Sequence, residues 1–274
     1  MEGLGNQLFQ FTFAHHLGLK YGIPTQLVRP FKPWRVEDRP FELEKLVQTC
    51  THLDVSWDKR FRLARFLERA NARLALEKFI PVPLIRMRFS EKHLLKLKSP
   101  WVRRSTFTGF FQQVDFSAGS IESVVSELNS HIGEFPRICN HPYIAIHVRR
   151  GDFDLHRFGW LNFEYYQNIL NEIHENLPVI IVTDSPADAE SLFSDLEISQ
   201  ILGPYDLSAW QTLAVMAESA YLIGANSTLS FWGAVLNISK NGQAFMPEIW
   251  MKGDSRRVPI WDRFSFQIRP ALWI

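Results

Sequence analysis

From residue 143 onward, short apolar runs alternate with segments of helical periodicity. Runs of strand length lie at 143–148, 179–183, 221–224 and 243–246, with a shorter one near Ile201. Between them, apolar side chains recur at helical spacing in 163–176, 187–193, 208–219 and 229–238. Strands that alternate with helices form parallel sheets that helices cover on both faces. The sequence therefore predicts an α/β fold with a doubly wound parallel sheet in this half of the chain.

The first of these strands ends in a cluster of charged residues. The apolar run 143–148 is followed directly by Arg149, Arg150, Gly151 and Asp152. Ligands in open α/β sheets bind outside the carboxyl ends of the strands. Because the planar fork of arginine matches phosphate oxygens, this stretch predicts a bound diphosphate. The alternative is a pair of solvated surface arginines that anchor carboxylates, and this stretch alone does not decide between them.

Two later strands also end in polar loops. Asp184 and Ser185 follow the strand 179–183, and Asn226, Ser227 and Thr228 follow the strand 221–224. The second loop opens a helix, whose backbone N–H groups and dipole favour a phosphate. The carboxylate of the first loop suits a base or a ribose. In both loops the alternative is helix capping. Together the three loops predict a nucleotide site at one edge of the sheet.

The beginning of the chain indicates a second anion site. Gly3 and Gly5 form a predicted tight loop before a helix over 7–21. This is not the dinucleotide fingerprint, because Leu8 occupies the third glycine position and no strand precedes the loop. Strand-like composition at 105–111 and a predicted helix at 121–132 follow. The proline-containing segment 134–142 is the expected linker between domains 1–138 and 139–274.

Charge and composition exclude some classes of protein. The net charge of +1 gives no reason to expect a nucleic-acid partner. The segment from Asp58 to Arg104 holds 14 Lys and Arg against 4 Asp and Glu. Within it, 58–79 is a predicted basic amphipathic helix, either a solvated face or a peripheral contact with an anionic membrane. No apolar run has the length of a membrane span, so a cytoplasmic location is expected, with a peripheral position at the inner face of the membrane as the alternative. Two cysteines and no metal-ligand spacing predict no metal site.

Three stretches together resemble a known enzyme family. Residues 3–11, 147–152 and 226–237 are similar, in order, to the hallmark motifs of the α-1,2-fucosyltransferases, family 11 of the glycosyltransferases. The resemblance covers nearly the whole chain and implies a GT-B-type fold of two Rossmann-like domains facing a cleft. It also implies inverting, metal-independent transfer of L-fucose from GDP-β-L-fucose to the 2-hydroxyl of a galactoside. The implied partners are GDP-fucose, which is a substrate and not a cofactor, and a galactose-terminated glycan acceptor.

The resemblance also implies a role for individual residues. Arg149 would bind the diphosphate and stabilise the leaving GDP, with Arg150 as a further substrate contact. Asp152 would orient the arginines or the acceptor, and it is the nearest candidate for the general base. The remaining expected substrate contacts are His147 and Asp184 near the guanosine, Ser227 and Thr228 on phosphate oxygens, Asn226 shaping their loop, and Asn6 facing the cleft. Two alternatives stay open: a transferase for another nucleotide sugar, and a degenerate protein that binds GDP-sugars without transferring them.

Overall fold

The computed structural model describes residues 3–22, 24–30, 40–50, 53–58, 87–90, 105–112, 118–151, 155–253 and 264–273. The chain divides into two compact units, Met1–Ser120 and Ile121–Ile274. This division falls near the start of the helix α5 (Ala118–Ile132), earlier than the expected boundary after residue 138. Most of α5 belongs to the second unit because it contacts other residues there: Asn129 Nδ2, for example, donates to Ser239 Oγ at 2.9 Å.

The first unit is built around the buried helix α1 (Leu4–Tyr21). Gly22 ends the helix in the left-handed conformation, with φ 60°, which glycine adopts at little cost. The helix begins earlier than expected, so Gly5 lies buried inside its first turn and not in a loop. The short helix α2 (Glu44–Thr49) follows. The strands form two parallel pairs, β1 (Thr25–Pro30) with β2 (Leu53–Asp58) and β3 (Met87–Ser90) with β4 (Ser105–Thr108).

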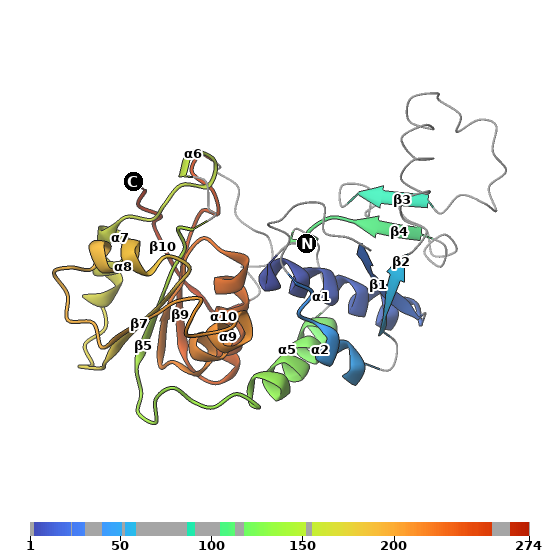
Figure 1. Cartoon of the computed structure of the whole chain (residues 1–274), viewed down its shortest axis with the longest axis horizontal. Coiled ribbons are helices and arrows are strands. Elements are labelled where there is room, and N and C mark those ends of the chain that lie inside the picture. Colours follow the sequence, from blue (N-terminus) through green and yellow to red (C-terminus); the bar gives the residue numbers. More distant parts are fainter. Residues whose placement is uncertain are drawn as a thin grey trace. The chain divides into compact units, whose positions relative to one another are not determined.

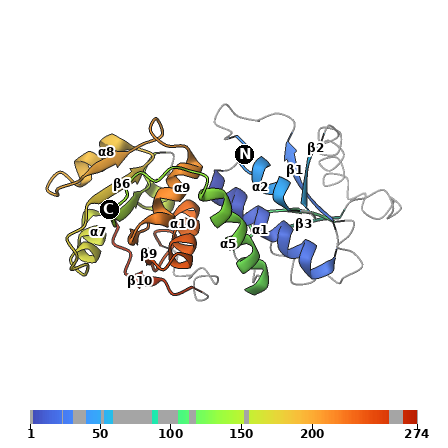
Figure 2. The same ribbon diagram turned by 90° about the horizontal axis from the view of Figure 1, so that it is seen from below.

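The second unit contains a six-stranded, wholly parallel sheet, which confirms the predicted doubly wound sheet. Its strands are β5 (Ile144–Val148), β6 (Val179–Thr183), β7 (Gln200–Leu202), β8 (Tyr221–Ile223), β9 (Gln243–Pro247) and β10 (Gln267–Arg269). Its further helices are α6 (Leu155–Phe158), α7 (Phe163–Leu170), α8 (Pro186–Leu192), α9 (Ala209–Glu218) and α10 (Thr228–Ser239). The helices α9 and α10 lie side by side on one face of the sheet, and α7 and α8 cover the other (Figures 1 and 2). Both units therefore contain helices and parallel strands, as a GT-B-type fold requires of each domain.

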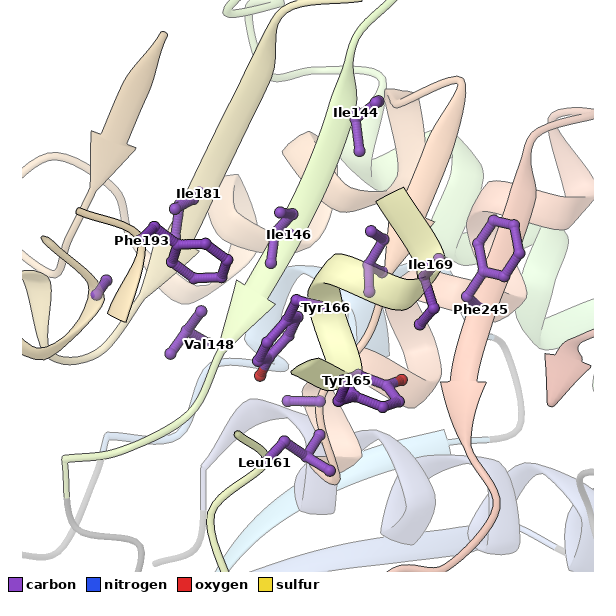
Figure 3. Close-up of a cluster of buried hydrophobic side chains, with 13 residues drawn as sticks. Ile144, Ile146, Val148, Leu161, Tyr165, Tyr166, Ile169, Ile181, Phe193 and Phe245 are labelled. Atoms are coloured by element: carbon purple, nitrogen blue, oxygen red, sulfur yellow. The ribbon is translucent and has the colours of Figure 1, made fainter. Parts of the chain in front are cut away.

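The side chains of β5 point alternately to the two faces of the sheet. Ile144, Ile146 and Val148 point toward α7 and pack in one buried cluster with Tyr165 and Tyr166 (Figure 3). The residues between them turn to the opposite face, because side chains alternate along a strand. The tyrosine hydroxyls attach α7 to the ends of two strands: Tyr165 donates to the carbonyl of Gly224 at 2.9 Å, and Tyr166 to that of His147 at 3.5 Å.

The order of the strands fixes where a ligand is expected. Along the sheet the order is β10-β9-β8-β5-β6-β7, so the chain winds outward from β5 to β7 and then resumes at β8, on the other side of β5. The switch point lies between β5 and β8. Helices leave a doubly wound sheet in opposite directions at such a point, and the carboxyl ends of the strands border a crevice there.

Three expectations differ from the structure or lie outside it. The helix α7 ends at Leu170 and does not reach residue 176. The edge strand β10 had no counterpart among the expected elements, because a three-residue strand of mixed polarity has too little periodicity to detect. The predicted basic helix 58–79 falls outside the described residues, apart from Asp58 at the end of β2. No helix in the described part of the chain is both long enough and apolar enough to span a membrane.

Candidate functional site

Arg149 and Asp184 meet at the carboxyl ends of two neighbouring strands. The parallel register of β5 and β6 pairs Val148 with Thr183, so the next residue of each strand leaves the sheet beside the other. Arg149 Nη1 lies 2.7 Å from Asp184 Oδ2, and each of the two side chains is 17% exposed. The second carboxylate oxygen, Oδ1, accepts the backbone N–H of Arg150 at 2.8 Å. One aspartate thus holds both the backbone and the side chain of the loop after β5.

Arg150 differs from its neighbour in its surroundings. It is only 3% exposed, and its Nη2 donates to the carbonyl of Leu161 at 2.6 Å. The guanidinium also lies over the ring of Trp160, 4.8 Å from its centre. Burial lowers the pKa of Arg150 from its usual value, but a guanidinium remains charged at neutral pH. Its described partners are protein groups, and the expected substrate contact of Arg150 stays a prediction.

His147 points to the opposite face of the sheet from Val148. Its Nδ1 lies 2.5 Å from Ser230 Oγ in α10, and the same hydroxyl accepts the backbone N–H of Ala225 at 3.0 Å. Burial, together with the positive charge of Arg149, lowers the pKa of His147 to about 3, so the imidazole is neutral at neutral pH. His147 is only 3% exposed, and its contact with Ser230 joins β5 to the start of α10. The expected contact of His147 with guanine stays a prediction.

Ser227 and Thr228 form the amino end of α10, beyond the end of β8. Ser227 is the N-cap: its Oγ accepts the N–H of Leu229 at 3.3 Å, and its carbonyl accepts that of Phe231 at 3.0 Å. The capping alternative is therefore confirmed for Ser227. A capped helix end still directs its dipole and first N–H groups outward, so capping and anion binding are compatible. The phosphate contacts of Ser227 and Thr228 stay predictions.

Asn226 joins three segments of the second unit. Its buried Nδ2 faces the carbonyls of Phe158, Gly159 and Trp250, at 3.3, 3.5 and 3.2 Å, and its two hydrogens are shared among them. The amide therefore ties the segment after β5 and the segment after β9 to the loop after β8. Residues 226–228 match the Asn-X-Ser/Thr sequon for N-glycosylation, but Asn226 is 2% exposed, so this sequon is inaccessible in the fold.

In the first unit, Asn6 has a partner that sequence reasoning did not identify. Gln112 Nε2 donates to Asn6 Oδ1 at 3.0 Å. The preceding residue, Phe111, has a φ of 57°, which is uncommon for a residue other than glycine. Its ring stacks on Phe13 with the centres 4.1 Å apart, and this packing holds the strained turn that presents Gln112. The remaining expected residue, Asp152, lies outside the described residues.

The second-unit site therefore combines one partly exposed guanidinium with the amino end of a helix, beside the switch point of the sheet. These groups suit a ligand with several anionic oxygens, such as a diphosphate. Among the described residues, His, Cys, Asp and Glu side chains do not gather in groups of three or more that could hold a metal ion. Ser230 and Gln112 are the supporting residues that sequence reasoning missed. The only available signal for Ser230 was its position within the stretch 226–237.

The sequence model described as Glycosyl transferase family 11 matches residues 100–250, more than half of the chain. The chain belongs to this family. Among its relatives, an Escherichia coli α-1,2-colitosyltransferase is 23% identical over 99% of this chain and 95% of its own length. The E. coli O-antigen biosynthesis glycosyltransferase WbnK is also 23% identical, over 93% of this chain and 94% of its own. Family membership makes the protein a glycosyltransferase.

Solved structures with a similar fold share little sequence with this chain. POFUT1 in complex with GDP-fucose is 15% identical with a TM-score of 0.42, over 85% of this chain and 91% of that one. E. coli ADP-heptose LPS heptosyltransferase II is 12% identical with a TM-score of 0.49, over 97% of this chain and 86% of that one.

Proposed function

We propose that this member of family 11 transfers L-fucose from GDP-β-L-fucose to the 2-hydroxyl of a galactoside, with inversion and without a metal ion. One observation carries the proposal: Arg149 and the amino end of α10 border the switch point between β5 and β8. That position suits the diphosphate of a nucleotide sugar. The motifs that resemble the α-1,2-fucosyltransferases support GDP-fucose as the donor and a galactoside as the acceptor.

The chemistry follows from the charge that develops. The acceptor oxygen attacks the anomeric carbon from the face opposite GDP, and the bond from that carbon to the β-phosphate oxygen breaks. Negative charge grows on the β-phosphate, where Arg149 and the helix amino end stabilise it. One such donor typically contributes about 2.7–4 kcal/mol to the transition state. No divalent ion is needed in this scheme, because a guanidinium and N–H dipoles offset the charge.

The acceptor hydroxyl must lose a proton, and this requires a general base. His147 is a poor candidate, because the residue is only 3% exposed and its Nδ1 lies within hydrogen-bond distance of Ser230 Oγ. Asp152 therefore stays the proposed base, as the carboxylate that directly follows the arginine loop in sequence.

One relative favours a second candidate donor. The α-1,2-colitosyltransferase carries the same linkage in its name, but colitose lacks one of the ring hydroxyls of L-fucose. GDP-colitose is therefore the second candidate. A site that hydrogen-bonds the extra hydroxyl discriminates strongly against the sugar that lacks it, because its buried polar groups are then left unpaired.

A donor panel tests the proposal. The protein is incubated with lactose and, in turn, GDP-fucose, GDP-colitose, GDP-mannose and UDP-galactose, each with and without EDTA. We expect the highest kcat/KM with GDP-fucose, no effect of EDTA, and an NMR spectrum that places α-fucose on the 2-hydroxyl of galactose. A preference for GDP-colitose would replace the donor, and activity that EDTA abolishes and magnesium restores would refute metal independence. GDP binding without any transfer would favour a degenerate GDP-sugar-binding protein.

A further inference from the structure

Both carboxylate oxygens of Asp184 are engaged by the loop after β5. Oδ1 accepts the backbone N–H of Arg150 at 2.8 Å, and Oδ2 lies 2.7 Å from Arg149 Nη1. Oδ2 is buried and makes no hydrogen bond of ordinary geometry within the described residues, so the guanidinium of Arg149 balances its charge. A nucleoside that used Oδ2 would have to displace Arg149 first.

Gly151 makes this arrangement sterically possible. A Cβ atom on Gly151 would lie 2.5 Å from Asp184 Oδ2 and 2.9 Å from its Cγ, closer than real Cβ contacts. Any side chain at position 151 would therefore push the carboxylate away from the loop. The glycine in the stretch 147–152 thus has a physical function: it allows the carboxylate of β6 to lie against the backbone that follows β5.

We propose that Asp184 is a positioning residue that holds the guanidinium of Arg149 in place for the donor diphosphate, and that Gly151 supplies the space for it. This assignment rests on the proposed function, and it differs from the expected role of Asp184 as a contact of the guanosine. Asp184 acts through Arg149 and does not touch the substrate.

The physical advantage is preorganisation. An arginine side chain has several rotatable bonds, and ordering it only when the ligand arrives weakens binding. An arginine already fixed by a carboxylate keeps its remaining donors aimed in one direction. Misplacement of a contact group by about 1 Å can reduce a rate by about a hundredfold. Asp184 therefore improves both diphosphate binding and turnover, although it carries the same sign of charge as the ligand.

Nucleotides with one and two phosphates distinguish positioning from direct contact with the nucleoside. Calorimetry with GDP and GMP is carried out on the full-length wild type, Asp184→Asn and Gly151→Ala. We expect both variants to bind GDP on the order of tenfold more weakly and GMP unchanged, with kcat for fucose transfer lowered by up to about a hundredfold. Asp184→Glu retains the charge and should restore part of the GDP affinity. Asp188→Asn is the matched control, because it removes an exposed carboxylate nearby whose partner is Ser185.

A double variant makes the test decisive. If Asp184 acts through Arg149, then Asp184→Asn causes no further loss of GDP affinity once Arg149→Ala is present. A direct nucleoside contact gives the opposite result: GMP and GDP weaken by the same factor, with or without Arg149. That result overturns the proposal. Thermal denaturation of each variant shows whether it is folded, and Gly151→Ala tests the same contact with Asp184 itself intact.

The two proposals fail separately. If the wild type transfers no fucose but binds GDP more tightly than GMP, the proposed function fails and the positioning of Arg149 is still tested by the binding series. If fucose transfer is observed but Asp184→Asn weakens GMP and GDP alike, the proposed function stands and the positioning role is wrong.

Discussion

Arg149 and Arg150 are adjacent in the sequence but have different physical surroundings. The guanidinium of Arg150 is buried against Trp160 and bonded to the carbonyl of Leu161, whereas that of Arg149 is 17% exposed and paired with Asp184. A buried, hydrogen-bonded cation contributes to the stability of the fold. We propose that the partly exposed guanidinium of Arg149, beside the switch point of the sheet, binds the ligand.

Separate substitutions should therefore have separate effects. We expect Arg150→Ala to lower the free energy of unfolding by about 1.5–3 kcal/mol, because it removes a charged donor from a buried carbonyl. Arg149→Ala should also lower that free energy, because it leaves the buried Oδ2 of Asp184 without its counter-charge, but unlike Arg150→Ala it should greatly weaken GDP binding. Urea denaturation measures the free energy of unfolding of both variants, and calorimetry measures their affinity for GDP. A loss of stability confined to Arg149→Ala would contradict the structural role of Arg150.

His147 predicts a dependence of stability on pH. Its pKa in the fold, about 3, lies below the usual 6.5, so between these values the unfolded chain binds a proton that the folded chain does not. The stability that this group contributes is complete above its usual pKa and is lost as the pH falls toward 3, at up to about 1.4 kcal/mol per pH unit.

The variant His147→Gln isolates this contribution. Urea unfolding of both proteins is compared between about pH 7 and about pH 5. The wild type should lose more stability over this interval than the variant, because glutamine does not titrate. Equal slopes for the two proteins would mean that His147 is not held neutral in the fold.

At the level of residues, sequence reasoning could place side chains at an edge of the sheet but could not determine their orientation. The carboxyl ends of parallel strands lie together, so Arg149, Asp184 and Ser227 were expected close to one another. Which arginine is buried depends on the carbonyl of Leu161 and the ring of Trp160, and neither contact leaves a sequence pattern. Ser230 was missed for the same reason, because its bond to His147 spans two elements.

At the level of elements, the end of the chain holds the segment that follows β5. Leu161 forms an antiparallel bridge with Trp273, and the N–H of Asn162 donates to the carbonyl of Leu272 at 2.9 Å. Gly159 makes room for this contact: its φ is 76°, and an added Cβ would lie 2.7 Å from Lys252 Cβ and 2.9 Å from the Trp273 ring.

Two glycine substitutions test this attachment. Gly159→Ala should lower the free energy of unfolding by about 1–3 kcal/mol more than Gly253→Ala, because overpacking is added to backbone strain. Gly253 is the matched control: its φ is 80°, but no atom of the described residues lies within 4 Å of its added Cβ. Urea denaturation of the two variants gives the difference directly. Equal losses would show that the end of the chain does not press on Gly159.

Elements with strong periodicity were predicted well, and short ones were not. The helices α9 and α10 and the strands β5 and β6 lie within a residue or two of the expected bounds, because long apolar patterns reflect burial directly. The edge strand β10 and the short helix α6 owe their conformation to tertiary contacts. The helix α1 starts earlier than its sequence predicts, because Gly5, a residue typical of loops, is buried within the first helical turn.

At the level of the whole molecule, the alternation of strands and helices predicted the doubly wound parallel sheet, and the motifs predicted the family. The division into units was harder to locate. Prolines in 134–142 suggested a linker, whereas the structure divides the chain near the start of α5, a helix that bonds to α10 through Asn129 and Ser239. Proline content reports local chain geometry, but a domain boundary depends on which residues pack together.

The central claim is that Arg149 and the amino end of α10 bind the donor diphosphate without a divalent ion. Its most direct test is the rate of fucose transfer from GDP-fucose to lactose in EDTA, by the wild type, Arg149→Lys and Arg149→Ala. We predict full wild-type activity in EDTA, a loss of about a hundredfold to a thousandfold for Arg149→Ala, and a smaller loss for Arg149→Lys, which retains the charge but not the fork. Turnover by Arg149→Ala close to that of the wild type, or wild-type activity that requires magnesium, would contradict the claim.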